Sequence, residues 1–264
     1  MAHIFKITIL LLLFSCSVNE KEITITEGDD KNIFEKGIQL IEEKKFKESI
    51  DQFIKINDEF PYSKYSSQAQ IYNAYLNFEI NKPDKTIILL TEYISMNPNG
   101  IFTEYAEYLI AMCYYIKVSD PSRDSKFTKI AIDKFKKIIK SNPNSKYAKD
   151  AKFKLEYLNN YLARKEFEVG MYYLKNNAPS PAINRFSVVI KDFQGTSIIP
   201  QTLYRMYEAF EILKLDDKSE QTYLILKYNF PKSKWTKEIT NKKNNVIEEP
   251  GYFKNIMNKM ISIF

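Results

Sequence analysis

Small, bulky and turn residues recur along the chain at fixed spacing. A small residue is followed four positions later by a bulky apolar one, and eight positions after that by a turn residue, usually proline. The pattern occurs at Ser49/Phe53/Pro61, Thr86/Leu90/Pro98, Ala131/Phe135/Pro143, Ala182/Phe186/Gln194 and Ser219/Tyr223/Pro231. Residues four apart share one face of a helix, and proline ends a helix because it has no N–H to donate. The pattern therefore predicts five amphipathic helices, each ending before its turn residue.

A second helix precedes each of these in the predicted arrangement. Gly37 precedes Ser49 by the same twelve residues by which Gly170 precedes Ala182. Glycine, then a small residue, a phenylalanine and a proline at these offsets form the tetratricopeptide pattern. The small residues let two antiparallel helices approach closely, and the bulky residue fills the gap to the next repeat. Each hairpin leaves an apolar face that only a neighbour can cover, so we predict an all-α tetratricopeptide superhelix of about five helical hairpins.

The repeats are longer than the usual period of about 34 residues. In the third repeat the excess falls on the polar stretch 117–125. In the fourth it follows Pro143, where apolar residues continue at helical spacing and no breaker appears before Asn176. We predict one long helix from about Ser145 to about Lys175, roughly 45 Å in length. It would join two lobes of the superhelix.

The N-terminal segment has the features of an export signal. Lys6 precedes a short apolar run that ends at Cys16. The run is too short to span a bilayer but fits the core of a signal peptide. Leu13-Phe14-Ser15-Cys16 resembles a bacterial lipoprotein box, which implies that Cys16 becomes the lipidated N-terminus, with palmitate among its acyl chains. Ser17 after the cysteine implies transport to the outer membrane, and an ordinary cleaved signal with an incidental cysteine is the alternative.

The C-terminal segment is polar and then amphipathic. Phe253, Ile256, Met257, Met260 and Ile261 would share one side of a short helix. This helix would dock back on the repeats, contact a partner or lie on the membrane surface, and docking is our first choice. The predicted organisation is a signal peptide at 1–15, a lipidated flexible tether at 16–31, repeats 1–3 at 32–143, the long helix with repeats 4 and 5 at 144–235, and a polar linker with the amphipathic tail at 236–264.

The composition argues against catalysis. His3, the only histidine, leaves with the signal, which excludes a Ser-His-Asp triad and a Cys/His zinc site. With Cys16 acylated, Cys113 is the remaining thiol and no internal disulfide forms. Gly is scarce, and we find no phosphate-binding or dinucleotide motif. We therefore predict a binding protein with no catalytic residue, no metal and no cofactor.

The net charge does not point to a further class of partner. The formal net charge is +6, too weak to indicate nucleic acid as a partner. Ten lysines lie between residues 126 and 154, against two aspartates. This segment would meet anionic lipid or peptidoglycan, or form a solvated convex face, and the solvated face is the favoured interpretation. Cys113 lies among apolar residues, which favours a buried small side chain.

Several segments in order resemble the BamD family, the tetratricopeptide lipoproteins of outer-membrane β-barrel assembly. The resemblance covers roughly residues 32–235. Its carriers are Pro61-Tyr62-Ser63, Tyr65 to Gln70, Arg123-Asp124, Pro143 to Ala151, Leu162-Ala163, Glu166, Tyr172-Tyr173 and Ala182-Ile183-Asn184-Arg185. Two departures are Asp192 to Thr196, in place of the family's Tyr-Pro turn, and Asn176-Asn177 before Ala178. The order of these segments, the insertion and the long helix match together.

The resemblance implies a non-enzymatic function on the periplasmic face of the outer membrane, through a lipid anchor. The implied partners are the periplasmic POTRA domains of the barrel-forming subunit of the BAM complex, other BAM lipoproteins, and unfolded outer-membrane β-barrel precursors. The precursors would be recognised by an aromatic-ended segment. The alternative is a periplasmic repeat scaffold bound to peptidoglycan or to cell-division machinery.

Two sets of candidate contacts follow. Asn184 and Arg185 match the family's contact with the barrel-forming subunit, and a guanidinium suits an acidic partner as a planar bidentate donor. On sequence alone Arg185 would be a solvated helix charge. Tyr72, Tyr75 and Phe78 are candidates for a peptide groove in the N-terminal lobe. Tyr75 and Phe78 share the stripe of Ile71, so packing in the core is the competing interpretation.

Overall fold

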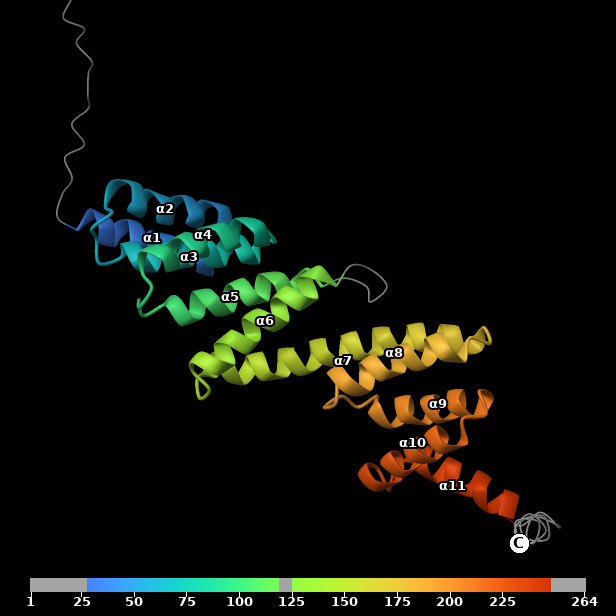
Figure 1. Cartoon of the computed structure of the whole chain (residues 1–264). Helices are drawn as coiled ribbons and strands as arrows, with labels where there is room; N and C mark the ends of the chain where they lie inside the picture. The colour runs from blue at the N-terminus through green and yellow to red at the C-terminus, as the bar shows by residue number, and fades with distance from the viewer. Residues whose placement is uncertain (1–27, 119–124, 248–264) are drawn as a thin grey trace, which may run out of the picture. The chain divides into compact units, whose positions relative to one another are not determined.

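The computed structural model describes residues 28–118 and 125–247, and these residues fold into helices without a β-strand. Figure 1 shows their order along the chain. The helices are α1 (Asp29–Glu42), α2 (Phe46–Glu59), α3 (Ser66–Glu79), α4 (Pro83–Met96), α5 (Thr103–Ile116), α6 (Lys126–Ser141), α7 (Lys146–Lys175), α8 (Pro179–Asp192), α9 (Ile199–Ile212), α10 (Asp216–Asn229) and α11 (Lys234–Ile247). The predicted all-α class and the five hairpins, α1/α2 to α9/α10, are confirmed.

The chain divides into two compact units, one up to Ser66 and one from Ser67. The first contains the hairpin of α1 and α2, and the second contains the helices that follow. The lobe boundary that we predicted at residues 143 and 144 falls inside the second unit. The first helix begins at Asp29, within the predicted tether of residues 16–31.

The recurring triplets occupy equivalent places in all five hairpins. Each second helix ends two residues before its turn residue, as α2 ends at Glu59 before Pro61 and α8 ends at Asp192 before Gln194. Every small and bulky residue of the five triplets is buried. The bulky residues form the core because the triplet spacing puts them on the face opposite to solvent.

The small residues mark the close approach of two helices. The Ser49 hydroxyl on α2 donates to the carbonyl oxygen of Gly37 on α1 at 2.8 Å, and Thr86 on α4 donates to the carbonyl oxygen of Ala74 on α3 at 3.1 Å. The ring of Phe53 lies directly over Gly37, 2.8 Å from where a Cβ would stand. The bulky residue thus packs first against its own hairpin. Phe186 also lies in one cluster with Leu203 of the next hairpin, as the predicted filling of the gap requires.

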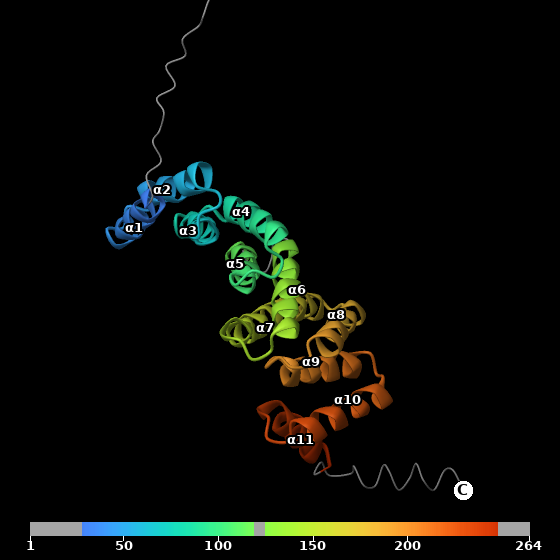
Figure 2. The same cartoon turned by 90° about the vertical axis from the view of Figure 1, so that its left-hand side faces the viewer.

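The long helix α7 confirms the predicted span and belongs to two hydrophobic clusters. Its N-cap Ser145 accepts a hydrogen bond from the backbone N–H of Ala148 at 3.0 Å, the usual device for starting a helix. Leu158 packs in the cluster of α5 and α6, and Phe167 packs in the cluster of α8 to α11. Figures 1 and 2 show α6 meeting the first part of α7 and α8 lying along the second. The helix therefore fixes these two cores relative to each other.

The predicted polar linker after residue 235 is wrong over its first part, because Lys234–Ile247 form helix α11. Thr236 and Ile239 recur at helical spacing and are buried, and Trp235 packs against the same cluster. The sequence around them is rich in lysine and asparagine, so its apolar face is narrow. Packing on α9 and α10 provides the burial that this helix requires. The predicted amphipathic tail lies outside the described residues.

Cys113 on α5 is a buried free thiol, as predicted. Burial raises the pKa of its thiol to about 12, with Lys117 acting in the opposite direction. Within the described ranges, no helix is both long and apolar enough to cross a membrane. The predicted signal, the tether before Gly28 and Cys16 itself lie outside those ranges.

Four hairpins turn through one residue in the left-handed backbone region. These residues are Lys44, Asn81, Asn177 and Lys214, with φ between 55° and 59°. Each stands two residues after the last residue of its first helix. A lysine in this conformation carries steric strain that glycine does not.

Lys214→Gly is expected to raise the free energy of unfolding by about 1 kcal/mol, because the strain at φ 58° is relieved. Chemical denaturation followed by circular dichroism measures the change. Lys136→Gly, in the exposed middle of α6, is the matched control and is expected to lower stability by about 1 kcal/mol. Equal losses in both variants would contradict the assignment of strain to Lys214.

Candidate functional site

Asn184 and Arg185 lie on α8, beside the long helix α7. Arg185 Nη1 donates to Glu166 Oε2 on α7 at 3.0 Å. The Arg185 side chain is still 45% exposed, and that of Glu166 is 24% exposed. A guanidinium has five N–H donors, so this geometry leaves capacity for a carboxylate from another molecule.

A small hollow of about 250 Å³ opens beside this pair. Its lining consists of Tyr173, Pro181, Asn184, Arg185 and Val188. The structure thus brings the two predicted residues together at the edge of an aromatic and aliphatic surface. Sequence reasoning missed Tyr173 and Val188 as lining residues. Only the packing of α8 against α7 places them next to Arg185.

A second hollow lies in the part of the chain that follows Ser67, where α3, α5 and α7 meet. It has a volume of about 300 Å³ and is mainly aromatic. Its lining residues are Gln68, Ile71, Tyr72, Tyr75, Ile101, Phe102, Tyr105 and Tyr147. The rings of Tyr105 and Tyr147 have centroids 5.7 Å apart. Such a surface suits an apolar or aromatic side chain of a peptide.

The structure places the three predicted groove residues differently. Tyr72 and Tyr75 line this aromatic hollow, and Phe78 does not. Tyr75 and Phe78 both pack against the hydrophobic cluster of α3 to α5. Burial raises the pKa of the Tyr75 hydroxyl, and the neighbouring Glu79 adds to the effect. Burial also raises the pKa of Tyr105 strongly. Both hydroxyls therefore remain neutral donors at physiological pH.

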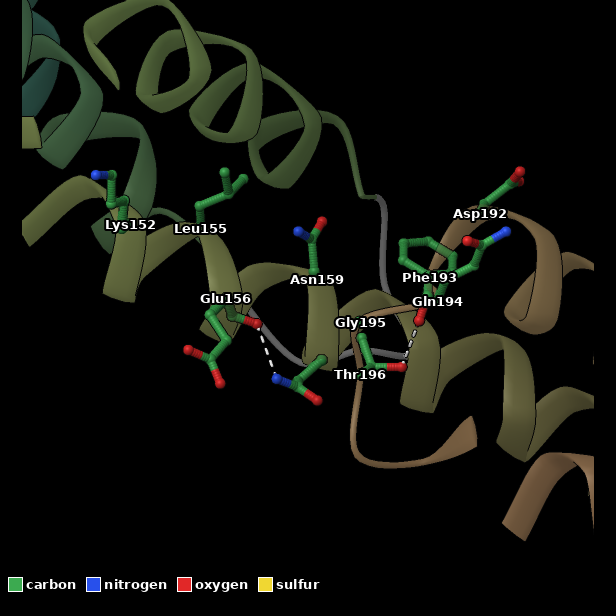
Figure 3. A pocket seen from close by; sticks show the side chains of 10 residues that line it. Lys152, Leu155, Glu156, Asn159, Asp192, Phe193, Gln194, Gly195 and Thr196 are labelled. Carbon is green, nitrogen blue, oxygen red and sulfur yellow. Dashed lines mark hydrogen bonds between the residues drawn. The ribbon is translucent and has the colours of Figure 1, made fainter. Parts of the chain in front are cut away.

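The loop of residues 192–196 packs against α7. Figure 3 shows the long helix on one side and the loop with Gly195 and Thr196 on the other. Between them is a hollow of about 300 Å³, lined from α7 by Lys152, Leu155, Glu156, Asn159 and Asn160, and from the loop by Asp192 to Thr196.

Hydrogen bonds fix this loop in place. The Thr196 hydroxyl donates to the carbonyl oxygen of Phe193 at 2.7 Å, and Asn160 Oδ1 accepts the backbone N–H of Ser197 at 3.2 Å. Phe193 packs against both clusters that α7 joins. These contacts hold the turn of residues 192–196 in place without a proline.

A larger hollow, with a volume of about 1330 Å³, lies among α7, α9, α10 and α11. Its lining carries charges of both signs, and some of them form ion pairs. Glu208 accepts from Arg205 at 2.6 Å and lies 3.7 Å from Lys242, and Glu220 pairs with Lys243. Because the lining carries charges of both signs, the hollow offers no field of one sign to a ligand. In the described part of the chain, no group of three or more His, Cys, Asp or Glu side chains could hold a metal ion.

Comparison with known proteins places the chain in a family. Residues 26–225 match the family model YfiO, described as an outer membrane lipoprotein. The outer membrane protein assembly factor BamD of Rickettsia prowazekii is 36% identical over 203 residues, covering 77% of this chain and 81% of that protein. The factor of the same name from Caulobacter vibrioides is 31% identical over 222 residues, covering 83% and 73%.

A solved structure of a thermophilic TPR protein from Thermus thermophilus is also similar, at 14% identity and a TM-score of 0.36. The match covers 77% of this chain and 93% of that one. The family model extends over all five triplets except the end of the last. The chain belongs to the YfiO family of outer membrane lipoproteins, whose members include the BamD assembly factors.

Proposed function

We propose that this chain is an outer membrane protein assembly factor, acting as a non-catalytic scaffold of the BAM complex in the insertion of β-barrel proteins. The observation that carries the proposal is the match to two BamD factors over at least three quarters of this chain. A row of helical hairpins supports it, because such repeats offer extended surfaces to protein partners. The family match does not favour the alternative of a scaffold for peptidoglycan or cell division.

The anchor and the location are further parts of the proposal. Cys16 carries the lipid, and the repeats lie on the periplasmic face of the outer membrane. The resemblance of Leu13-Phe14-Ser15-Cys16 to a lipoprotein box supports this. Two or more acyl chains on one residue are enough for stable anchoring without a spanning helix.

The surface of Asn184 and Arg185 is our proposed contact with the POTRA domains of the barrel-forming subunit. The half-exposed guanidinium is oriented by Glu166 on the neighbouring helix. An ion pair to a rigid helix reduces the rotamer freedom that binding would otherwise have to remove. An acidic side chain of the partner would then meet a pre-positioned donor, with Tyr173 and Val188 as apolar neighbours.

Arg185→Glu is expected to abolish co-purification with the barrel-forming subunit from solubilised envelopes, because it places two carboxylates at a position that requires a donor. Arg164→Glu reverses the charge of an exposed arginine on α7 and is the matched control. It is expected to retain the subunit. Quantitative pull-down measures both. Unchanged recovery with Arg185→Glu would count against this contact, provided that circular dichroism shows both variants to be folded.

The aromatic hollow is our proposed site for β-barrel precursors. Tyr72, Tyr75 and Tyr105 line it together with the strongly exposed Ile101. Aromatic side chains attract one another beyond the effect of area alone. An aromatic-ended peptide segment would therefore place its ring among these tyrosines.

Ile101→Asp is expected to weaken binding of an aromatic-ended precursor peptide at least about tenfold, because it brings a charge to the rim of an apolar hollow. Ile101 is 89% exposed, so the change has little effect on folding. Ile88→Asp on α4, at a position 66% exposed and away from the hollow, is the control. Fluorescence anisotropy with a labelled peptide gives both affinities. The site is refuted if the two variants bind alike.

A further inference from the structure

The outer face of α10 carries an exposed apolar patch. Leu224, Ile225 and Tyr228 are 52%, 50% and 86% exposed. They lie within about one helical turn on the side opposite the buried Ser219 and Leu226. We call this surface the α10 patch. Single exposed apolar residues are normal on a protein surface, but a contiguous group calls for a reason.

The patch is specific to the last hairpin. When the five triplets are aligned, the three equivalent positions in the earlier second helices are mostly polar or charged. They are Ile54, Lys55 and Asp58 in α2, Thr91, Glu92 and Ser95 in α4, Lys136, Lys137 and Lys140 in α6, and Ser187, Val188 and Lys191 in α8. Repeat arrays usually end in a unit with a polar outer face. Helix α11 follows the fifth hairpin and packs on it, but Leu224, Ile225 and Tyr228 stay exposed, so α10 has an apolar outer face where the other four second helices are mostly polar.

Helix α11 ends close to the patch. Lys243, four residues before the end of α11, pairs with Glu220 near the start of α10. Glu220, Leu224 and Tyr228 follow one another at intervals of four residues, so they form one stripe along α10. The end of α11 therefore lies at the N-terminal end of the stripe that carries the patch.

Residues 248–264 continue the chain from this point. The four residues 248–251 are Glu-Glu-Pro-Gly, a turn sequence that extends at most about 14 Å. The segment 252–264 follows, with its apolar residues at helical spacing. A chain that reverses after α11 would run back beside α10 and reach the patch within two helical turns.

The chemistry of the two surfaces is complementary. From residue 250 onward the charged side chains of the tail are two lysines, Lys254 and Lys259. Asp216 and Asp217 are exposed in the first turn of α10, and Asp217 lies on the same side as Leu224 and Tyr228. The tail sequence therefore offers an apolar strip with two lysines, which would complement an apolar patch with aspartates at its edge.

We infer that residues 252–264 of this chain dock on the α10 patch and cap the last hairpin. Because the tail is held by one narrow surface, it is also the part of the array most easily displaced by a partner.

Limited digestion of the full mature chain with trypsin tests the docking. Leu224→Asp is expected to speed cleavage after Lys254 and Lys259 about tenfold, measured by mass spectrometry, because an undocked tail is open to the protease. Phe153→Asp, at a 71% exposed position on α7, is the control and is expected to leave both rates unchanged. Equal rates in the two variants would overturn the inference.

Disulfide trapping gives a second, independent measurement. The mature chain with Cys16→Ser, Ile225→Cys and Met257→Cys is expected to form an intramolecular cross-link under mild oxidation, at a rate independent of dilution. The pair Phe153→Cys and Met257→Cys is expected to remain largely reduced. Failure to cross-link overturns the inference, and cross-linking only between two chains would identify a second copy as the occupant instead.

Discussion

Phe186→Ala is expected to lower the free energy of unfolding by about 3–5 kcal/mol. Phe186 is completely buried, packs against Phe167 with ring centroids 5.7 Å apart, and lies in the cluster of α7 to α11. Removing the ring loses its transfer free energy and leaves a cavity that the packed helices α7 and α8 cannot easily close. Urea denaturation followed by circular dichroism measures the loss.

Phe153→Ala is the matched control for this change, because Phe153 is also a helical phenylalanine but is 71% exposed. Its expected effect is within about 0.5 kcal/mol. A loss of similar size in both variants would show that Phe186 is not the centre of this core. Repeat arrays can unfold in parts, so near-ultraviolet and far-ultraviolet signals should be followed together.

Gly170→Ala is expected to destabilise the chain by about 1–2 kcal/mol, although alanine normally favours a helix over glycine. A Cβ at this position would stand 2.5 Å from Cε1 and 2.7 Å from Cδ1 of Phe186. These contacts are to a buried ring in a packed core, so either the ring or the helix has to move. The same denaturation experiment gives the change in free energy.

Gly195→Ala provides the contrast, because a Cβ there meets no atom within 4 Å. It is expected to be neutral or slightly stabilising. The double variant Gly170→Ala with Phe186→Leu is expected to recover part of the loss of Gly170→Ala, since leucine lacks the ring carbons that clash. Strictly additive losses would argue against a direct contact between the two positions.

These two positions also hold the proposed partner surface in place. Arg185 directly precedes Phe186 on α8, and Glu166 is four residues before Gly170 on α7. The separation of the two helices is set by the ring that fits over the glycine. The 3.0 Å ion pair between Arg185 and Glu166 depends on that separation. A variant that moves α7 and α8 apart is therefore expected to weaken the proposed partner contact by displacing Arg185, although the arginine itself is unchanged.

Much of the fold was predictable because each repeat has the same spacing of small, bulky and turn residues. Ser49 and Phe53 predicted a packed helix face, Pro61 predicted its end, and the absence of breakers after Ser145 predicted α7. Helix α11 was not predictable in this way, since Thr236 and Ile239 offer only a narrow apolar face in a polar segment. Its stability comes from contact with α9 and α10, which no local pattern describes.

The candidate site shows the same division. The resemblance to the family suggested Asn184 and Arg185 as a partner contact, and the sequence offered Tyr72, Tyr75 and Phe78 as groove candidates with core packing as the competing interpretation. The sequence could not predict which residues contact them, because Glu166, Tyr105 and Tyr147 come from other helices. Phe78 and Tyr75 share α3 and both pack against the cluster of α3 to α5, but of these two only Tyr75 also lines the hollow.

The all-α class, the hairpins and the long helix followed from the sequence, because they depend on the spacing of residues along each helix. The resemblance to the family followed from the order of its segments. Only the tertiary structure decided that the lobe boundary lies inside a compact unit and that the glycines lie under phenyl rings. It also decided that α11 exists and that Leu224, Ile225 and Tyr228 form a patch with nothing from the described residues over them. Contacts between helices depend on crossing geometry and on what each face finally meets, and a pattern within one helix carries no information about either.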